Sequence, residues 1–443
     1  MQKRFAFAAT LGLVLIALVA TAASAAPRPG FSITPLLEPN GGSETALSYS
    51  ASGFGAMTAL SWLSPYGTHM WTGQFGTTPV DQGVFDLNLA PGVSGGEDAD
   101  IDLGSTGTLH ATSLIFIDKG FRLGVSALTC PNANTSNNFA SCKKQIIDTT
   151  QADRQWITSR GSHVWIAYHD SGSSTTVHVQ RSDDDGFTFA KVGDPITGNG
   201  TTTGGSTFNN ENGPIVADPS SNMLYDVYAY GTASIQKGTS ADFNNVAVAR
   251  SMDGGVTWTT TTIFSAPMGA VEDNIFPSLA VDPASGSVYA TWSDQAHVYV
   301  SKSTDHGVTW SKTPVVATAS PVATAVEPWI AARNGTVDVV YYGTNVAGNS
   351  NTENNAAWNV YLAQSTNGGS TFAQTQVTSK PNHVGPICTG GISCKSGTRN
   401  LLDLFEDAID PQNGKVGIIY TNDTLTTDSA GNPLPQAVLA QQN

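Results

Sequence analysis

Short apolar segments separated by turn residues repeat along most of the chain. The clearest unit spans residues 274–310 and holds apolar runs at 276–283, 286–292 and 297–302, followed by a further run that begins at residue 310. Runs of this length that are rich in Val, Ile, Tyr and Trp and bounded by Gly, Pro, Asn or Ser are typical of β-strands. Four such strands in succession predict one blade of a β-propeller.

The same order of segments recurs along the rest of the chain. Similar units lead up to residues 182, 251 and 365, and two more lie around residues 97–150 and 402–443. A weaker unit at 44–85 raises the prediction to seven blades, and without it the ring has six. The last unit ends before its fourth strand, whereas the segment 32–37 is left over near the N-terminus. We expect this segment to supply the missing strand and so remove a sheet edge. The sequence therefore predicts an all-β fold, a single propeller of four-stranded antiparallel blades over residues 26–443.

One short motif occurs four times, each time after the third strand of a unit. The pattern Ser-x-Asp-x-Gly-x-Thr-Trp/Phe starts at residues 182, 251, 303 and 365, and its acidic position holds Asp184, Asp253, Asp305 and Asn367. The Asp and hydroxyl groups can hydrogen-bond the backbone of the turn, and Gly accepts a positive φ. The motif thus predicts a structural turn between the third and fourth strands. It resembles the Asp-box, or BNR repeat, of the sialidase superfamily of β-propellers.

The first 25 residues are typical of a signal peptide. A basic start at Lys3 and Arg4 precedes an apolar run, and Ala23 to Ala25 resemble a cleavage site. We expect cleavage near Ala25 and a secreted product. The net charge of −15 with only 20 Lys and Arg disfavours nucleic acid and anionic membranes as partners. No later segment is long and apolar enough to predict insertion into a membrane.

Four cysteines in an exported chain indicate disulfides. Proximity favours the pairs Cys130–Cys142 and Cys388–Cys394 among three connectivities. The first pair would close the turn that the motif closes in other blades. Neither pair has the spacing of a zinc site, so no metal ligands are assigned. A structural Ca²⁺ near the acidic residues described next stays an open alternative.

The blade geometry indicates where a functional site would lie. First strands begin, and second strands end, on the face of the ring opposite the four motif turns. Acids and aromatics gather at these positions, as they do in sugar-binding and glycosidase sites. The acids could equally be solvated or pair with turn amides. The candidate catalytic residues are Glu97, Asp98, Asp153, Glu211, Asp273 and Glu327, and the candidate substrate-binding residues are Arg154, Trp156, His169, Trp292, Trp329 and Tyr342.

The resemblance to sialidases implies three arginines that hold the substrate carboxylate, a Tyr–Glu nucleophile pair and an acidic acid/base residue. The family's Arg-Ile-Pro motif is absent here. Of Arg122, Arg154 and Arg399, only Arg154 is expected at the site, and lysine does not replace a guanidinium clamp. We therefore expect a glycoside hydrolase that acts on neutral or cationic extracellular glycans or glycoproteins without a cofactor. The alternative is a non-catalytic propeller that binds glycan or protein, and exo-sialidase activity is the least favoured. The sequence does not indicate an oligomeric state.

Overall fold

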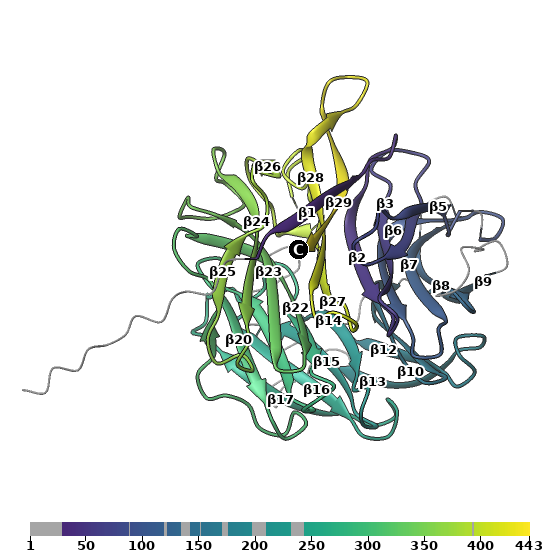
Figure 1. Cartoon of the computed structure of the whole chain (residues 1–443). Coiled ribbons are helices and arrows are strands. Elements are labelled where there is room, and N and C mark those ends of the chain that lie inside the picture. The colour runs from purple at the N-terminus through teal and green to yellow at the C-terminus, as the bar shows by residue number, and fades with distance from the viewer. Residues whose placement is uncertain are drawn as a thin grey trace, which may run out of the picture.

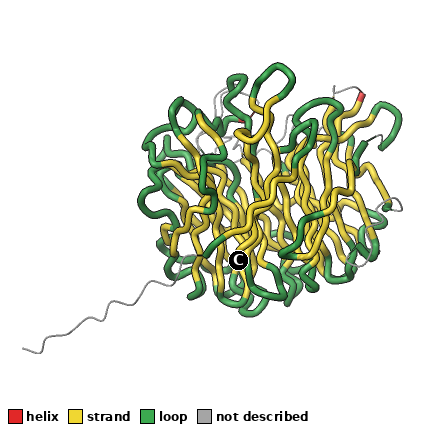
Figure 2. The backbone as a smooth tube through the Cα atoms, turned by 45° about the horizontal axis from the view of Figure 1, so that its top comes forward, coloured by secondary structure: helices red, strands yellow, loops and turns green. Residues whose placement is uncertain are grey.

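The computed structural model describes residues 29–87, 89–118, 122–133, 142–150, 152–170, 176–196, 210–231, 243–391 and 394–443. The described residues form seven antiparallel sheets arranged as the blades of a propeller, as expected (Figure 1). Figure 2 shows the strands making up the body of the molecule, with turns along its rims. The signal peptide predicted at residues 1–25 lies outside the described residues and stays a prediction. No helix in the described ranges is both long and apolar enough to span a bilayer.

Six blades follow one another along the chain. The first three consist of β2 (Ser43–Tyr49), β3 (Phe54–Leu60), β4 (Thr68–Gln74) and β5 (Val80–Val84); β6 (Val93–Leu103), β7 (Leu109–Ile117), β8 (Arg122–Cys130) and β9 (Lys143–Asp148); and β10 (Ala152–Arg160), β11 (His163–Asp170), β12 (Val177–Ser182) and β13 (Ala190–Ile196). The next three consist of β14 (Asn210–Ala217), β15 (Leu224–Tyr230), β16 (Asn245–Ser251) and β17 (Thr259–Ser265); β18 (Ser278–Val281), β19 (Val288–Ser293), β20 (Val298–Ser303) and β21 (Val315–Val316); and β22 (Thr324–Arg333), β23 (Thr336–Thr344), β24 (Ala357–Ser365) and β25 (Ala373–Gln376), with β26 (His383–Val384) added beside β24.

The seventh blade joins the two ends of the chain. It contains β27 (Glu406–Ile409), β28 (Val416–Thr427) and β29 (Pro433–Gln442), and its outer strand is β1 (Phe31–Leu36). Strand β1 pairs with β29 from Phe31 opposite Gln442 to Leu36 opposite Ala437, as Figure 1 shows in purple and yellow. The predicted ring closure by the N-terminal segment is confirmed. The weak unit at 44–85 is also confirmed as a blade, so the alternative of six blades is wrong.

Packing of sheet on sheet explains the apolar pattern. Each blade contacts a neighbouring blade on both of its faces, so its inner strands are buried on both sides. Such strands need no strict alternation of apolar and polar residues. All residues of β19 are buried, whereas β17, at the outer edge of its blade, is largely exposed or half-buried. The hydrophobic clusters accordingly lie between blades; one of them joins Leu224 and Ile215 to Trp165 of the preceding blade.

The four Ser-x-Asp-x-Gly-x-Thr turns, called box turns from here on, connect the third and fourth strands of their blades, as predicted. In each, the Ser hydroxyl accepts a hydrogen bond from the Gly N–H, at 2.9 Å for Ser251 and Gly255. The acid accepts from the Thr main chain and hydroxyl, at 2.9 and 2.6 Å for Asp253 and Thr257. In the last turn Asn367 reverses one of these bonds, because its amide donates to the Thr371 hydroxyl. The box residues therefore bond to their own turns.

Loss of the Ser251 hydroxyl is expected to destabilise the fold. Ser251 is 1% exposed, so the substitution Ser251→Ala leaves the buried Gly255 N–H without its acceptor. We expect a loss of about 1–3 kcal/mol in the free energy of unfolding, measured by urea denaturation. Met252→Ala is the matched control, since Met252 lies in the same turn and is 68% exposed. Equal unfolding midpoints for the two variants would contradict the structural role of the turn.

Both predicted disulfides are present. Cys130–Cys142 joins the end of β8 to the start of β9 and so closes a connection between third and fourth strands, where other blades have a box turn. Cys388–Cys394 lies in the long connection between β26 and β27. There the Cys388 N–H also donates to the Thr398 carbonyl at 2.8 Å. The second disulfide thus braces the segment that leads to Arg399.

Candidate active site

The inner strand of most blades carries a bulge near its start. The pairing register shifts in β2, β6, β10, β14 and β22, between Asp153 and Trp156 in the case of β10. Glu44, Arg154 and Glu327 have φ values of 47°, 54° and 55° at these positions. Such values are uncommon for residues other than Gly, and bulges of this kind redirect side chains. The bulges bring charged residues from different blades into contact.

Arg154 lies at the middle of this arrangement. Its guanidinium group is 2.6 Å from Asp403, 3.5 Å from Asp98 and 3.6 Å from Glu211. These acids precede or belong to the inner strands of three other blades. The guanidinium carbon also lies 4.8 Å from the centre of the Phe276 ring, and the side chain is 16% exposed. Arg154 therefore links the inner strands of four blades.

Asp403 is the most strongly held acid. It is fully buried and is bound by both Arg154 and Arg399, with the Arg399 Nε at 2.9 Å. Burial alone would raise the pKa of Asp403, but the two guanidinium groups outweigh it and hold that pKa below its usual range. Asp403 is thus an ionised carboxylate that uses both arginines. The expectation that Arg399 lies away from the site is wrong.

The surrounding acids have raised pKa values. Burial is the main cause, and it raises the pKa of Glu97 and of Glu211 to about 7 and that of Asp153 to about 6. Burial also raises the pKa values of Glu44, Asp273 and Glu327 well above the usual range, with further repulsion from neighbouring acids. Among the neighbouring acids, Asp98 does most to raise the pKa of Glu44. We call this group the central acidic cluster: Glu44, Glu97, Asp98, Asp153, Glu211, Asp273, Glu327 and Asp403, with Arg154 and Arg399.

The raised pKa values predict a stability that falls as the pH rises. In the folded chain Glu97 and Glu211 keep their protons up to about pH 7, whereas in the unfolded chain they lose them near the ordinary value of 4.5. Between about pH 4.5 and 7 the folded state therefore binds more protons than the unfolded state. The contribution of these two groups to the free energy of unfolding is fully present below about pH 4.5 and is lost as the pH rises through 7. We expect the free energy of unfolding to fall by about 2–3 kcal/mol for each group across this range. The measurement is urea denaturation at pH 5, 7 and 8.5.

Two substitutions check the source of that pH dependence. Glu97→Gln and Glu211→Gln each remove one titrating group and should flatten the decline. Stability that stays constant or rises from pH 5 to 8.5 in the unmodified chain would contradict the raised pKa values.

All six candidate catalytic acids belong to the central acidic cluster. Sequence reasoning did not select Glu44, Arg399 or Asp403 as site residues. Asp403 and Glu44 both fit the expectation of an acid near the start of each inner strand. For Glu44 this holds once residues 44–85 are accepted as a blade. No such rule finds Arg399, because it comes from a loop.

The aromatic candidates are placed differently from expectation. Trp156 is 2% exposed, and Trp292 and Tyr342 are fully buried. Trp156 packs on Phe276 and Trp329, Trp292 donates to Glu272 at 3.0 Å, and Tyr342 packs on Phe405. These rings show no free face for a sugar, so their assignment to substrate binding is corrected. The cause is sheet packing, which turns them into the spaces between blades.

His169 and Trp329 stay candidates. His169 is half-buried and lies opposite Asp153 on β11. Burial lowers the pKa of His169 to about 4, so its ring is neutral at pH 7. Its Nε2 atom has no hydrogen-bond partner among the described residues. Trp329 is half-buried and tilted against Trp156.

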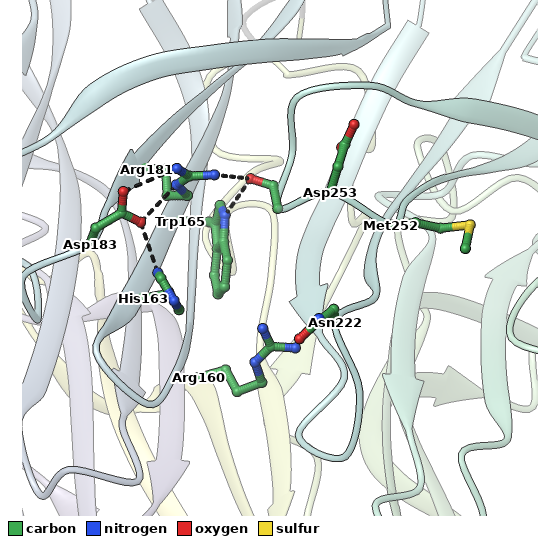
Figure 3. A pocket seen from close by; sticks show the side chains of 9 residues that line it. Arg160, His163, Trp165, Arg181, Asp183, Asn222, Met252 and Asp253 are labelled. Carbon is green, nitrogen blue, oxygen red and sulfur yellow. Dashed lines mark hydrogen bonds and ion pairs between the residues drawn. The ribbon is translucent and has the colours of Figure 1, made fainter.

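A separate cleft of about 260 Å³ lies between the β10–β13 blade and the β14–β17 blade, beside their box turns (Figure 3). Arg181 donates to the Gly254 carbonyl at 3.2 Å and pairs with Asp183 at 2.8 Å. His163 contacts the same Asp183 at 2.8 Å, and buried Trp165 also donates to Gly254. These paired groups join two blades, at the opposite end of β10 from Arg154.

No protein-family model and no curated protein sequence matches the chain. Several solved structures do. A polysaccharide lyase of family PL25, an ulvan lyase, is 10% identical over 92% of this chain and 95% of its own, with a TM-score of 0.55. The Hadza microbial sialidase Hz136 is 13% identical over 69% and 64%, and the α-L-arabinofuranosidase Arb93A of Fusarium graminearum is 11% identical over 72% and 92%, each with a TM-score of 0.47. The likeness is one of fold. At this identity it assigns no residue a role.

Proposed function

We propose that the chain is a secreted glycan-acting propeller that hydrolyses glycosidic bonds at its central acidic cluster. Glycosidases need one carboxylic acid that is protonated at working pH and one carboxylate nearby. Glu211 has a pKa raised to about 7 and a side chain that is 28% exposed, which suits a proton donor. Asp98 contacts the same guanidinium group of Arg154 and suits the role of the second carboxylate.

The separation of these two acids supports the pairing. The nearest oxygens of Asp98 and Glu211 lie 3.5 and 3.6 Å from two nitrogens of one guanidinium group. The two oxygens can therefore be no farther apart than about 9.5 Å, the upper limit in inverting glycosidases. In the proposed reaction Glu211 protonates the leaving oxygen, and Asp98 either activates water or attacks the sugar carbon. Glu97, whose pKa is also about 7, is the other donor candidate.

The charge of the cluster favours neutral or cationic saccharides. Arg154 and Arg399 both bind Asp403, so part of their positive charge is already balanced by that carboxylate. A substrate carboxylate would also face several acids. The ulvan lyase of the same fold is bound to a saccharide of glucuronic acid and sulfated rhamnose, so a glycan is a ligand that such a propeller can hold. The two disulfides are compatible with secretion.

The experiment is a hydrolysis assay of the purified chain on chromogenic glycosides of neutral sugars, amino sugars and sialic acid. We expect turnover of a neutral or amino sugar that is lost in Asp98→Asn. Turnover of the sialoside alone would overturn the substrate class. No turnover on any glycoside, together with binding to a glycan array, would overturn catalysis in favour of a binding propeller.

A further inference from the structure

Three potential metal ligands meet where the ring closes. Glu38 lies in the link between β1 and β2, His69 lies on β4, and Asp81 lies on β5. One ligand atom from each is within 4.8 Å of the other two. The group therefore joins the segment that follows β1, the outer strand of the closing blade, to β4 and β5, the two outer strands of the first blade. Its members are 31 and 12 positions apart in the sequence, and no spacing motif marks them.

The distances suit a shared ion better than direct contacts. The His69 Nδ1 is 3.6 Å from a Glu38 oxygen and 3.9 Å from an Asp81 oxygen, both longer than the usual hydrogen bond of about 2.7–3.2 Å. Two ligands bound tetrahedrally to one Zn²⁺ at about 2.0–2.1 Å are separated by roughly 3.3–3.5 Å. The Nδ1 atom is buried and has no hydrogen-bond partner among the described residues. A buried nitrogen thus faces two carboxylates across a gap.

Another blade shows the same residue types in direct contact. His178 lies on the third strand and Asp194 on the fourth strand of the β10–β13 blade, as His69 and Asp81 do in theirs. There the His178 Nδ1 lies 2.8 Å from Asp194, and Lys191 also contacts that carboxylate. The His178 pair needs no ion, so the wider gap around His69 is not a general result of this strand pairing.

Neighbouring groups hold the three ligands in place. The main chain of Glu38 exchanges two hydrogen bonds with the Gln436 side chain, at 2.8 and 3.0 Å. The Gly83 N–H donates to Asp81 at 2.7 Å, and the His69 ring stacks on Trp71. Outer contacts of this kind orient ligands and strengthen metal binding.

We propose that Glu38, His69 and Asp81 bind a divalent transition metal of the Zn²⁺ type, with water in the remaining position. One imidazole and two carboxylates suit Zn²⁺, which commonly takes three protein ligands and a water. Ca²⁺ is disfavoured because it takes six to eight oxygen ligands. The ion ties the β1–β2 link to β4 and β5, and so fastens the ring at the point where the two ends of the chain meet.

Zn²⁺ binding and thermal unfolding test this site in the purified chain after treatment with a chelator. We expect Zn²⁺ to raise the unfolding temperature of the unmodified chain and Ca²⁺ and Mg²⁺ to do so far less. Glu38→Gln and His69→Ala should weaken Zn²⁺ binding at least ~10-fold and remove the rise in unfolding temperature. His178→Ala, the matched control, should retain both. Co²⁺ should bind in place of Zn²⁺ and give visible absorption bands that disappear in Glu38→Gln.

The alternative is a protonated His69 that bridges the two acids without an ion. In that case Zn²⁺ does not raise the unfolding temperature of the unmodified chain, and the proposal is overturned. Equal Zn²⁺ binding in Glu38→Gln, His69→Ala and the unmodified chain would overturn it as well, because the ion would then lie elsewhere. Glu38→Gln keeps its main-chain bonds to Gln436, so it tests the site even if His69→Ala fails to fold.

Discussion

Replacing Glu211 by glutamine is expected to lower kcat by ~10²–10⁴-fold, the usual contribution of a general acid. The amide keeps the size of the side chain but cannot donate the proton that the proposed reaction needs. In the unmodified chain the proposed reaction predicts that kcat/KM falls above about pH 7, where Glu211 ionises. This alkaline decline should be absent from the residual activity of Glu211→Gln. The measurement is a pH–rate profile on the best substrate from the glycoside assay.

Glu272→Gln is the matched control for this experiment. Burial raises the pKa of Glu272 to about 7 as well, but this carboxylate accepts a hydrogen bond from Trp292 and does not contact Arg154. The Glu272→Gln substitution should leave the pH–rate profile unchanged. Full activity in Glu211→Gln, with loss in Glu97→Gln, would show that Glu97 is the proton donor instead.

The fold could be predicted because its signals are local. Box turns, short apolar runs and the unpaired segment at 32–37 are each visible within a few residues, and β1 pairs with β29 as expected. The faces of the ring follow from strand order alone. The position of the acids followed from the same rule, since each blade begins its inner strand at the same end.

The contacts within the site could not be predicted, because they join distant parts of the chain. Arg154 and Asp403 are 249 positions apart, and Arg399 reaches Asp403 from a loop braced by a disulfide. The assignment of Trp156 to substrate binding failed for a different reason. The bulge between Asp153 and Trp156 changes which face of the strand each following residue occupies, so Trp156 packs between blades while Arg154 faces the acids.

Arg154→Ala is expected to destabilise the chain by about 3–5 kcal/mol, the usual cost of removing one partner of a buried ion pair. Asp403 would keep only Arg399 while fully buried, and Asp98 and Glu211 would lose their nearest positive charge. Arg154→Lys should recover part of this loss, because it restores the charge but not the planar set of donors. The measurement is urea denaturation at pH 7, with activity followed in parallel.

The pH dependence of this loss separates charge from packing. At pH 5 Asp153 and Glu211, whose pKa values are about 6 and 7, hold their protons, so fewer negative charges depend on Arg154 and the loss should be smaller than at pH 7. Arg160→Ala, at the other end of β10, removes a guanidinium group that lies over Trp165 and should cost far less at either pH. A loss that is the same at both pH values would mean that Arg154 acts through its packing on Phe276. In that case the charge balance of the cluster would not depend on this arginine, and its acids would have to be neutralised by Arg399 and by protons.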